Sequence, residues 1–499
     1  MRANDAYAEL ERRFRRLNSL EEASAVLGWD QQTMMPPGGA RARAEQLATI
    51  RVLAHGMIID PALGDLIPAA GAQSGLDDWQ RANLREIERI WRHSTALTPD
   101  LVERMSHACS VCEMAWREAR PKSDFVQVLP HLQLVLDLTR EAAQAKSAVF
   151  GCSLYDALLD QYEPGSHAKR VDVLFDDLAA FLPGLIGDAL EHQARGPKML
   201  PLAGPFPVEQ QRQLGLELMK VAGFDFEHGR LDVSLHPFSG GTPEDVRITT
   251  RYREDDFMPA LMGVMHETGH ALYELGLPRD WVQQPVGKAR GMAMHESQSL
   301  LVEMQACRSM AFLAFAAPLL RKAFGGEGPA WQADNLYRHY THVERGFIRV
   351  DADEATYPAH VILRYRLERA LIGGDLKLAD LPGAWNEGMR TLVGVAPDND
   401  REGCLQDIHW YDGAFGYFPT YTMGAIAAAQ IFEAAQKADR NVLSGIGQGD
   451  FRPLLAWLRA NIHGRASLMG GTDEILMVAT GRPLDVATYK RHLQTRYLS

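Results

Sequence analysis

Cysteine is scarce in this chain, with five residues among 499, and the count is odd. Small secreted proteins that depend on a disulfide framework carry many more, so we expect a reducing compartment. Cys109 and Cys112 form a C-x-x-C pair inside a predicted helix, but no second pair completes an all-thiolate zinc site. We therefore expect these two cysteines to be structural.

Basic residues are also in the minority, which gives a formal net charge of −12 and a pI near 5.8. A general nucleic-acid-binding protein needs a basic surface, so the composition argues against that class. No run of about 18 apolar residues is present, and no membrane-spanning helix is expected. The first ten residues contain acids and no apolar run, unlike a signal peptide. These features favour a cytoplasmic protein.

Linkers rich in serine and glycine, low-complexity runs and internal repeats are missing as well. The hydrophobic content of 46% is ample for a large core. Length alone suggests several domains, but the sequence offers no boundary. We therefore expect residues 1–499 to form one domain with two lobes: a helical lobe and lid over 1–220, and a lobe over 221–499 that carries nearly all of the chemical motifs.

Helical periodicity runs through most of the chain and predicts a mainly α fold. Residues 29–39 interrupt it, because they end in two prolines and two glycines. The predicted helices span 4–28, 40–55, 77–93, 98–120, 124–149, 168–195, 208–222, 329–345, 356–372, 421–437, 450–463 and about 484–496.

One segment follows a different pattern. Apolar and polar residues alternate over 231–235 and again over 245–252, and a loop rich in glycine and proline separates the two runs. This pattern predicts a β-hairpin. An exposed strand edge there could pair with an extended peptide backbone, although a purely structural sheet fits the same pattern.

The most informative motif is His266-Glu267-x-x-His270, in the middle of an apolar helical pattern that begins near Phe257 and ends before Gly276. Histidines four residues apart lie on one helix face, so both imidazoles can bind one Zn²⁺. The glutamate between them can take a proton from a metal-activated water. Two core histidines are the alternative, but a buried glutamate needs a partner that offsets its desolvation.

A third ligand is expected from a second helical pattern. Glu296 lies 26 positions after His270, in His295-Glu296-Ser297-Gln298. This spacing leaves room for the first helix to end and for a second helix to present a carboxylate. Two histidines, one glutamate and an open fourth position are typical of a catalytic zinc site.

Several further motifs, taken in order with these, resemble the carboxypeptidase Taq family of metallocarboxypeptidases, and the resemblance covers most of the chain. Each motif is short, but their order makes coincidence improbable. The motifs are Trp29-Asp30-Gln31, His236-Pro237-Phe238, Asp245-x-Arg247-x-Thr249, the two histidine motifs above, Ile348-Arg349-x-x-Ala352-Asp353 and Gly403-x-x-Gln406-Asp407-x-His409-Trp410.

The resemblance implies a cytosolic, homodimeric enzyme that removes C-terminal residues from peptides one at a time, with broad specificity. It implies an elongated helical fold similar to neurolysin and angiotensin-converting enzyme, with two lobes, a deep groove and 221–499 as the catalytic lobe. Zn²⁺ is the expected metal, and Co²⁺ or Mn²⁺ are expected to substitute for it.

Roles for the remaining motif residues follow from this chemistry. Glu267 is the expected general base, and His295, Gln298 or Asp407 could orient the ligand histidines. A terminal carboxylate calls for an arginine, and Arg349 is preferred over Arg247. An internal ion pair is the alternative for each, because Asp351, Asp353 and Glu354 flank Arg349 and Asp245 lies two residues before Arg247. His409 and one tyrosine are expected to stabilise the oxyanion. The tyrosine candidates are Tyr411, Tyr417 and Tyr421, of which we assign Tyr421 to the oxyanion and Tyr417, with His236, to substrate contact.

Two alternatives share the zinc motif. An oligoendopeptidase of similar fold would leave its groove open beyond the cleaved bond and would not need a free C-terminus. A non-catalytic peptide-binding protein would not need Glu267.

Overall fold

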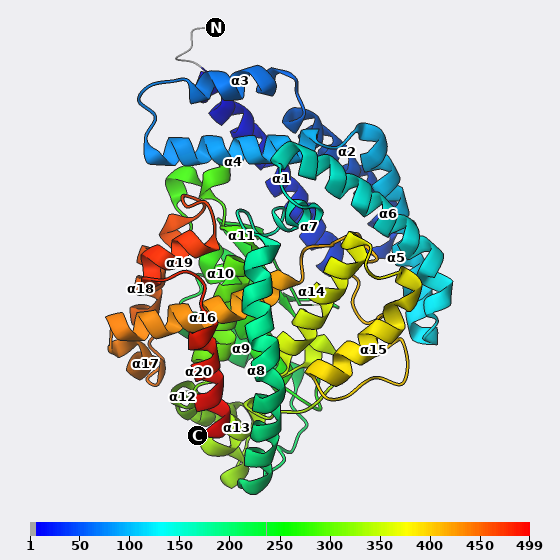
Figure 1. Cartoon of the computed structure of the whole chain (residues 1–499). Coiled ribbons are helices and arrows are strands. Elements are labelled where there is room, and N and C mark those ends of the chain that lie inside the picture. Colours follow the sequence, from blue (N-terminus) through cyan, green and yellow to red (C-terminus); the bar gives the residue numbers. More distant parts are fainter. Residues whose placement is uncertain (1–5, 236) are drawn as a thin grey trace.

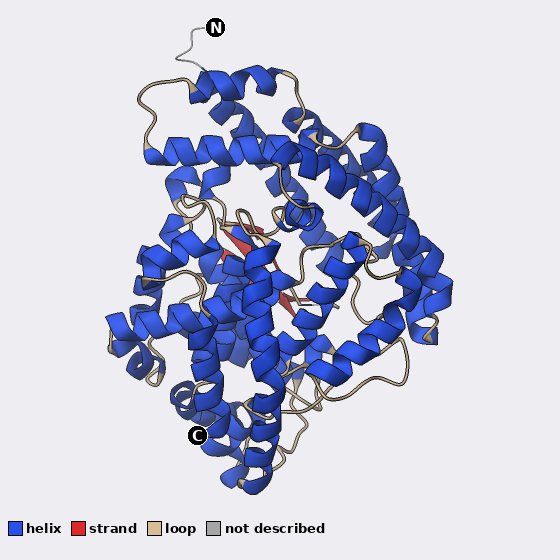
Figure 2. Ribbon diagram, in the orientation of Figure 1, coloured by secondary structure: helices blue, strands red, loops and turns tan. Residues whose placement is uncertain are grey.

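The computed structural model describes residues 6–235 and 237–499 and consists mainly of helices around one small sheet (Figures 1 and 2). The helices from the N-terminal part of the chain are α1 (Ala6–Thr33), α2 (Ala40–Ile58), α3 (Ala62–Gly71), α4 (Asp78–Thr95), α5 (Pro99–Lys122), α6 (Phe125–Phe150), α7 (Leu154–Leu159), α8 (Ala168–Arg195) and α9 (Val208–Ala222). The strands β1 (Gly229–Val233), β2 (Ser239–Thr242) and β3 (Asp245–Thr250) follow.

The rest of the chain is helical again. Its elements are α10 (Met258–Glu274), α11 (Gly291–Leu300), a π-helix (Leu301–Cys307), α12 (Met310–Phe324), α13 (Ala333–Tyr340), α14 (Tyr357–Gly373), α15 (Leu381–Leu392), α16 (Pro419–Ala438), α17 (Asn441–Ile446), α18 (Arg452–Asn461), α19 (Thr472–Thr480) and α20 (Val486–Leu498). The prediction of a mainly helical fold is confirmed.

Two predicted helix boundaries are wrong. The helix α1 continues through Thr33 into the predicted break, because its backbone hydrogen bonds run on until Met34 donates to Asp30, and only then do the prolines intervene. The helix predicted over 329–345 is a short 3₁₀ turn (Pro329–Trp331) followed by α13, which ends at Tyr340. Six shorter helices carried no prediction: α3, α7, α12, α15, α17 and α19.

The predicted β-hairpin is also wrong in its pairing. The strand β1 pairs with β3 in parallel, and β3 pairs with β2 in the antiparallel direction, so the order is β1-β3-β2. The loop expected between the two alternating runs contains β2, whose glycines hide its strand character. Gly241 has a φ of +88°, and a side chain there would meet the Asp245 carbonyl oxygen.

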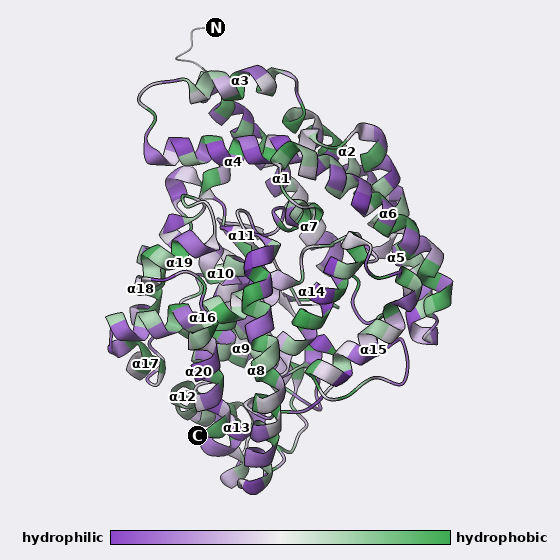
Figure 3. Ribbon diagram, viewed as in Figure 1, coloured by the Kyte–Doolittle hydropathy of each residue, from purple (hydrophilic) through white to green (hydrophobic). Residues whose placement is uncertain are grey.

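The sheet packs on α10, which lies deep in the molecule against α9, α11 and the π-helix, and α16 packs on α11. Most buried apolar residues of these helices belong to one core that extends from Leu101 to Tyr497. The sheet packs on Met219, Val264 and Ala271 of α9 and α10 in a separate apolar cluster. A smaller core joins α1, α3 and α4, and Figure 3 shows α4 mixing hydrophilic and hydrophobic residues along its length, as an outer amphipathic helix does. The core thus fixes α10, α11 and α16 relative to one another.

All five cysteines are free thiols. Burial raises the pKa of Cys109 to about 11 and that of Cys112 to about 12, which suits structural rather than reactive residues. No single helix in the described part of the chain is long and apolar enough to cross a membrane. Two pairs of segments pass that length and composition test only when joined across bends of 51° and 75°.

Candidate metal centre

The three predicted metal ligands come together on two packed helices. His266 and His270 lie one turn apart on α10, and Glu296 lies on α11. Glu296 Oε2 is 3.8 Å from His266 Nε2 and 3.4 Å from His270 Nε2. The three donor atoms lie within 4.8 Å of one another, and no other such group of three occurs in residues 6–235 and 237–499. The chemistry of the set, two imidazoles and one carboxylate, fits a divalent zinc-like ion.

Two glycines allow the helices to approach this closely. A Cβ at Gly269, between the two histidines, would lie 2.4 Å from the Gln298 carbonyl oxygen and 2.6 Å from Ser299 Cα. A Cβ at Gly424 of α16 would lie 2.8 Å from Glu296 Cβ. The backbones of α10 and α11 therefore touch directly, and α16 closes over the ligand carboxylate.

The far nitrogen of each ligand histidine is held by a hydrogen bond. His266 Nδ1 is 2.9 Å from Glu303 Oε2, and Glu303 Oε1 accepts a bond of 2.5 Å from Arg308. His270 Nδ1 is 3.1 Å from the backbone carbonyl of His295. Because both Nδ1 atoms face these acceptors, both Nε2 atoms are left for a metal, as in other histidine-ligated sites.

The candidates named for this orienting role are mostly wrong. The His295 side chain bonds Glu274, so His295 contributes only its carbonyl. Gln298 bonds His463 and Ser297, and Asp407 bonds two arginines. Glu303, which bonds the candidate ligand His266, was not predicted. It lies seven residues after Glu296, and that spacing on one helix face is a signal the sequence contains.

The electrostatics of the site suit a cation. Burial disfavours the charged form of His266, but Glu296 and Glu303 outweigh it and raise the pKa of His266 to about 10. A divalent ion bound between the three side chains would compete with a proton on His266. Burial, with the neighbouring His295, lowers the pKa of His270 to about 4 and leaves that imidazole neutral.

Glu267 faces the same space. Its side chain is buried, and it lies beside His266 on α10. Burial raises the pKa of Glu267 to about 7, opposed by His266 and reinforced by Glu296. A carboxyl whose pKa is near neutral can both accept and return a proton.

A cluster of aromatic residues closes another side of the site. His409 Nε2 is 3.1 Å from the Tyr421 hydroxyl, and the rings of Tyr417 and Tyr421 lie 5.2 Å apart. Burial lowers the pKa of His409 to about 4, and burial raises the pKa of both tyrosines, so all three groups are neutral donors or acceptors. Tyr421 lies one helical turn before Gly424, which touches Glu296. Tyr411, in contrast, is fully buried and donates to the Cys404 carbonyl.

Both candidate arginines are held by internal ion pairs. Arg349 donates to Asp407 through Nε and Nη2, at 3.1 and 2.7 Å, and Nη1 lies 3.3 Å from the Tyr357 hydroxyl. Arg364, also buried, donates to the other oxygen of Asp407 at 2.6 Å. Two guanidinium groups thus share one carboxylate, which leaves one surplus positive charge beside Tyr421, whose ring lies 4.9 Å from Arg349 Cζ.

The sequence neighbours of Arg349 have other partners. Asp353 accepts from backbone amides at the start of α14, and Glu354 pairs with His492 and Arg496. Asp407, which does pair with Arg349, is distant in the sequence.

Arg247 on β3 is different. It forms a two-pronged pair with Asp245, as its spacing predicted, and its Cζ lies 4.5 Å from the ring centre of Trp29 on α1. His236, the remaining candidate, lies outside the described residues.

Comparisons with known proteins found a matching family and several similar chains. The sequence model of the carboxypeptidase Taq (M32) metallopeptidase family matches residues 9–497. The chain is 40% identical over 461 residues to thermostable carboxypeptidase 1 of Thermus thermophilus, covering 90% of each chain. It is 33% identical to thermostable carboxypeptidase 1 of Pyrococcus furiosus, covering 99% of each.

Solved structures are similar over their full length. Trypanosoma cruzi metallocarboxypeptidase 1 superposes with a TM-score of 0.97 at 42% identity, covering 99% of this chain and 100% of that one. The M32 carboxypeptidase of Deinococcus radiodurans R1 superposes with a TM-score of 0.94 at 33% identity, covering 99% and 98%.

Proposed function

Because the chain belongs to the carboxypeptidase Taq (M32) family of metallopeptidases and is a metal-dependent peptide hydrolase, we propose that His266, His270 and Glu296 bind its catalytic metal. The observation that carries this proposal is the convergence of their donor atoms within 4.8 Å, with both Nε2 atoms left free by bonds at Nδ1. We propose Zn²⁺ as the ion, with Co²⁺ or Mn²⁺ able to substitute, because imidazole and carboxylate ligands suit all three.

When bound, the ion lowers the pKa of a water molecule and polarises the scissile carbonyl. Glu267 accepts a proton from the water that attacks the carbonyl carbon, and returns it to the amine nitrogen as the C–N bond breaks. Its burial and its pKa of about 7 support both halves of this transfer. His409 and Tyr421 lie close enough to each other to donate together to the developing oxyanion.

Removal of single C-terminal residues requires a group that holds the terminal carboxylate. The surplus positive charge of the Arg349–Asp407–Arg364 group supports a role for Arg349. Tyr417, whose ring packs on that of Tyr421, is the tyrosine proposed to contact the substrate. Arg247 and His236 remain secondary candidates. The edge strand β2 could align the peptide backbone. We also propose that the enzyme has broad specificity, that it is a cytosolic homodimer and that residues 1–220 form a lid.

The test is Glu267→Gln, with Glu387→Gln on the exposed face of α15 as the matched control. Peptides with free C-termini are incubated with metal-loaded enzyme, and the products are followed by mass spectrometry. We expect a ladder of C-terminal truncations from the parent and the control. Turnover by Glu267→Gln should fall about 10²- to 10⁴-fold while its metal content stays near one ion per chain. A variant that keeps its metal and cleaves at the parental rate would disprove the assignment of the base.

A further inference from the structure

A large cavity lies away from the metal centre, where the end of α8 meets α13 and the end of α20. Figure 1 shows these three helices converging near the C-terminus of the chain. The cavity has a volume of about 620 Å³, within the range of small-molecule sites. It shares no lining residue with the metal centre, so an inference about it does not rest on the proposed function.

The walls of this cavity are tied together by hydrogen bonds. The Gln193 side chain bonds both backbone groups of Val343, the residue at which the segment after α13 returns to α8. The loop after α8 is fixed by Asn335, which bonds both backbone groups of Leu200. The cavity is therefore preformed, which lowers the entropic cost of binding.

The polar lining is cationic. Lys198, Arg338 and Arg496 all face the cavity, with His192 and His342, whereas no aspartate or glutamate does. Arg496 is already paired with Glu354 behind the wall, but neither Lys198 nor Arg338 forms an ion pair with any residue in the described ranges. This surplus is unusual in a chain whose net charge is −12, and it favours an anionic ligand.

The rest of the lining is apolar or aromatic. Leu190, Met199 and Val343 contribute aliphatic surface, and Tyr337 and Tyr497 contribute rings. A free phosphate or sulfate ion would leave this surface uncovered. From the volume, the unpaired cations and the apolar walls, we propose that the cavity binds an amphipathic organic anion, with one carboxylate or phosphate group at Lys198 and Arg338 and a ring or apolar body between α8, α13 and α20.

The experiment uses isothermal titration calorimetry of the full chain with three ligands that share a naphthalene ring and differ in the head group. These are 1-naphthoate and 1-naphthyl phosphate, which carry the two alternative anionic groups, and the neutral 1-naphthylmethanol. We expect at least one anion to bind about tenfold or more tightly than the neutral compound. Whichever anion binds better identifies the head group. Equal affinity for all three, or no binding of either anion at millimolar concentration, would overturn the proposal.

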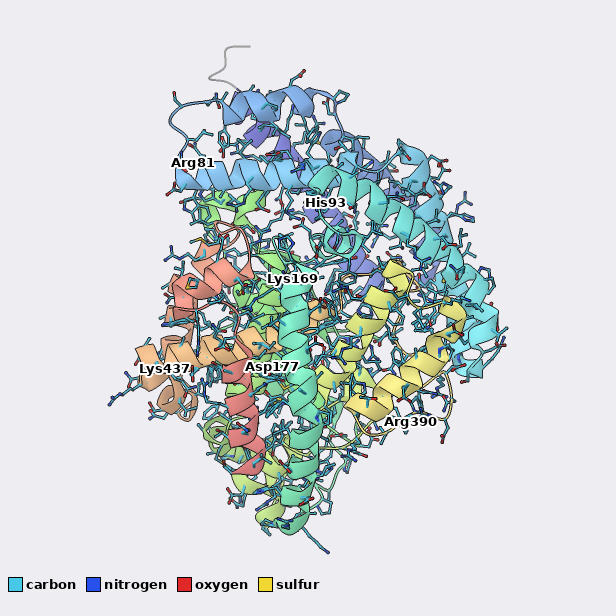
Figure 4. The ribbon with its side chains drawn as sticks, in the orientation of Figure 1. Arg81, His93, Lys169, Asp177, Arg390 and Lys437 are labelled. Atoms are coloured by element: carbon cyan, nitrogen blue, oxygen red, sulfur yellow. The ribbon has the colours of Figure 1, made fainter. Side chains whose placement is uncertain are left out.

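Two variants, Arg338→Gln and Lys198→Gln, test whether the anion binds in this cavity. Each should weaken the preferred anion about tenfold and leave the neutral compound unchanged. The matched control is Lys169→Gln at the opposite end of α8 (Figure 4), an exposed lysine that lies outside the cavity. Lys198 is exposed on a loop, so its variant tests the proposal even if Arg338→Gln folds poorly. Equal weakening by Lys198→Gln and Lys169→Gln would show that the anion binds elsewhere.

Discussion

Replacing Glu303 by glutamine should weaken metal binding without removing a ligand. Glu303 is buried and accepts hydrogen bonds from His266 Nδ1 and from Arg308. The amide keeps the size of the side chain but removes the charge that holds the His266 ring with Nε2 toward Glu296. It also leaves the half-buried guanidinium of Arg308 without its anion.

The loss of such an orienting partner costs about 10- to 100-fold in metal affinity, which corresponds to roughly 1.4 to 2.8 kcal/mol. Zn²⁺ affinity is measured by competition with a chromophoric chelator at fixed pH. We expect the loss of Zn²⁺ affinity in Glu303→Gln to fall in this range. The loss in Glu296→Ala, which deletes a proposed ligand, should be larger.

The control is Glu274→Gln on the same helix as the ligand histidines. Glu274 bonds the His295 side chain, whereas His270 is held by the His295 backbone carbonyl. This variant should change the affinity for Zn²⁺ by less than about threefold, well below the cost of a lost orienting partner. If Glu303→Gln binds Zn²⁺ as tightly as the parent, the bond to Nδ1 does not set the position of His266.

Three further predictions concern the substrate, the helix contact and pH. Arg349→Ala should reduce the preference for free-acid over amidated peptides about a hundredfold, measured as the ratio of their kcat/KM values. If this ratio is unchanged in both Arg349→Ala and Arg247→Ala, the terminal carboxylate of the substrate is bound elsewhere. Gly269→Ala should push α11 away and lower both the melting temperature and the Zn²⁺ affinity. The control is Gly263→Ala on the same helix, where a Cβ meets nothing within 4 Å, and it should be neutral or stabilising by up to about 1 kcal/mol. Equal effects of the two variants would refute the close contact between α10 and α11. Burial raises the pKa of Glu163 to about 7, so its contribution to stability is present below pH 4.5 and is lost as the pH rises through 7. Glu163→Gln should therefore gain stability over the parent between pH 5 and 8, by up to about 3 kcal/mol, and a difference in unfolding free energy that does not vary with pH would contradict this.

The sequence predicted best what depends on residues close together in the chain. His266 and His270 are one turn apart, and the helical period alone places their rings on one side of α10. Glu296 could be assigned because the site chemistry called for one more anionic ligand and the next helical pattern supplied it. The long amphipathic helices were predictable for the same reason, since their apolar positions recur at the helical period. Short helices such as α7 and α17, of six residues each, offer too few turns for a period to show.

The strands show where such local patterns fail. Alternation identified β1 and β3 correctly, but alternation says nothing of strand direction. The direction was decided by residues 239–242, which contain two glycines, have no apolar alternation and still form the edge strand that pairs with β3. Their contribution is backbone hydrogen bonding, which composition does not reveal.

The partner of Arg349 illustrates the same limit at the candidate site. Local spacing pointed to Asp351, Asp353 and Glu354, yet Arg349 pairs with Asp407, 58 positions along the chain. Only the packing of α14 against the segment before α16 brings Asp407 between Arg349 and Arg364. An isolated Arg349–Asp407 pair would be neutral overall and would attract a peptide carboxylate only weakly. Because Arg364 is added, the group keeps one positive charge next to Tyr421, and Asp407 holds both guanidinium groups in place before substrate arrives. The ion pair of Arg349 is therefore compatible with a role in binding the substrate carboxylate. An arginine that is already held in place binds an anion without the entropic cost of ordering its own side chain.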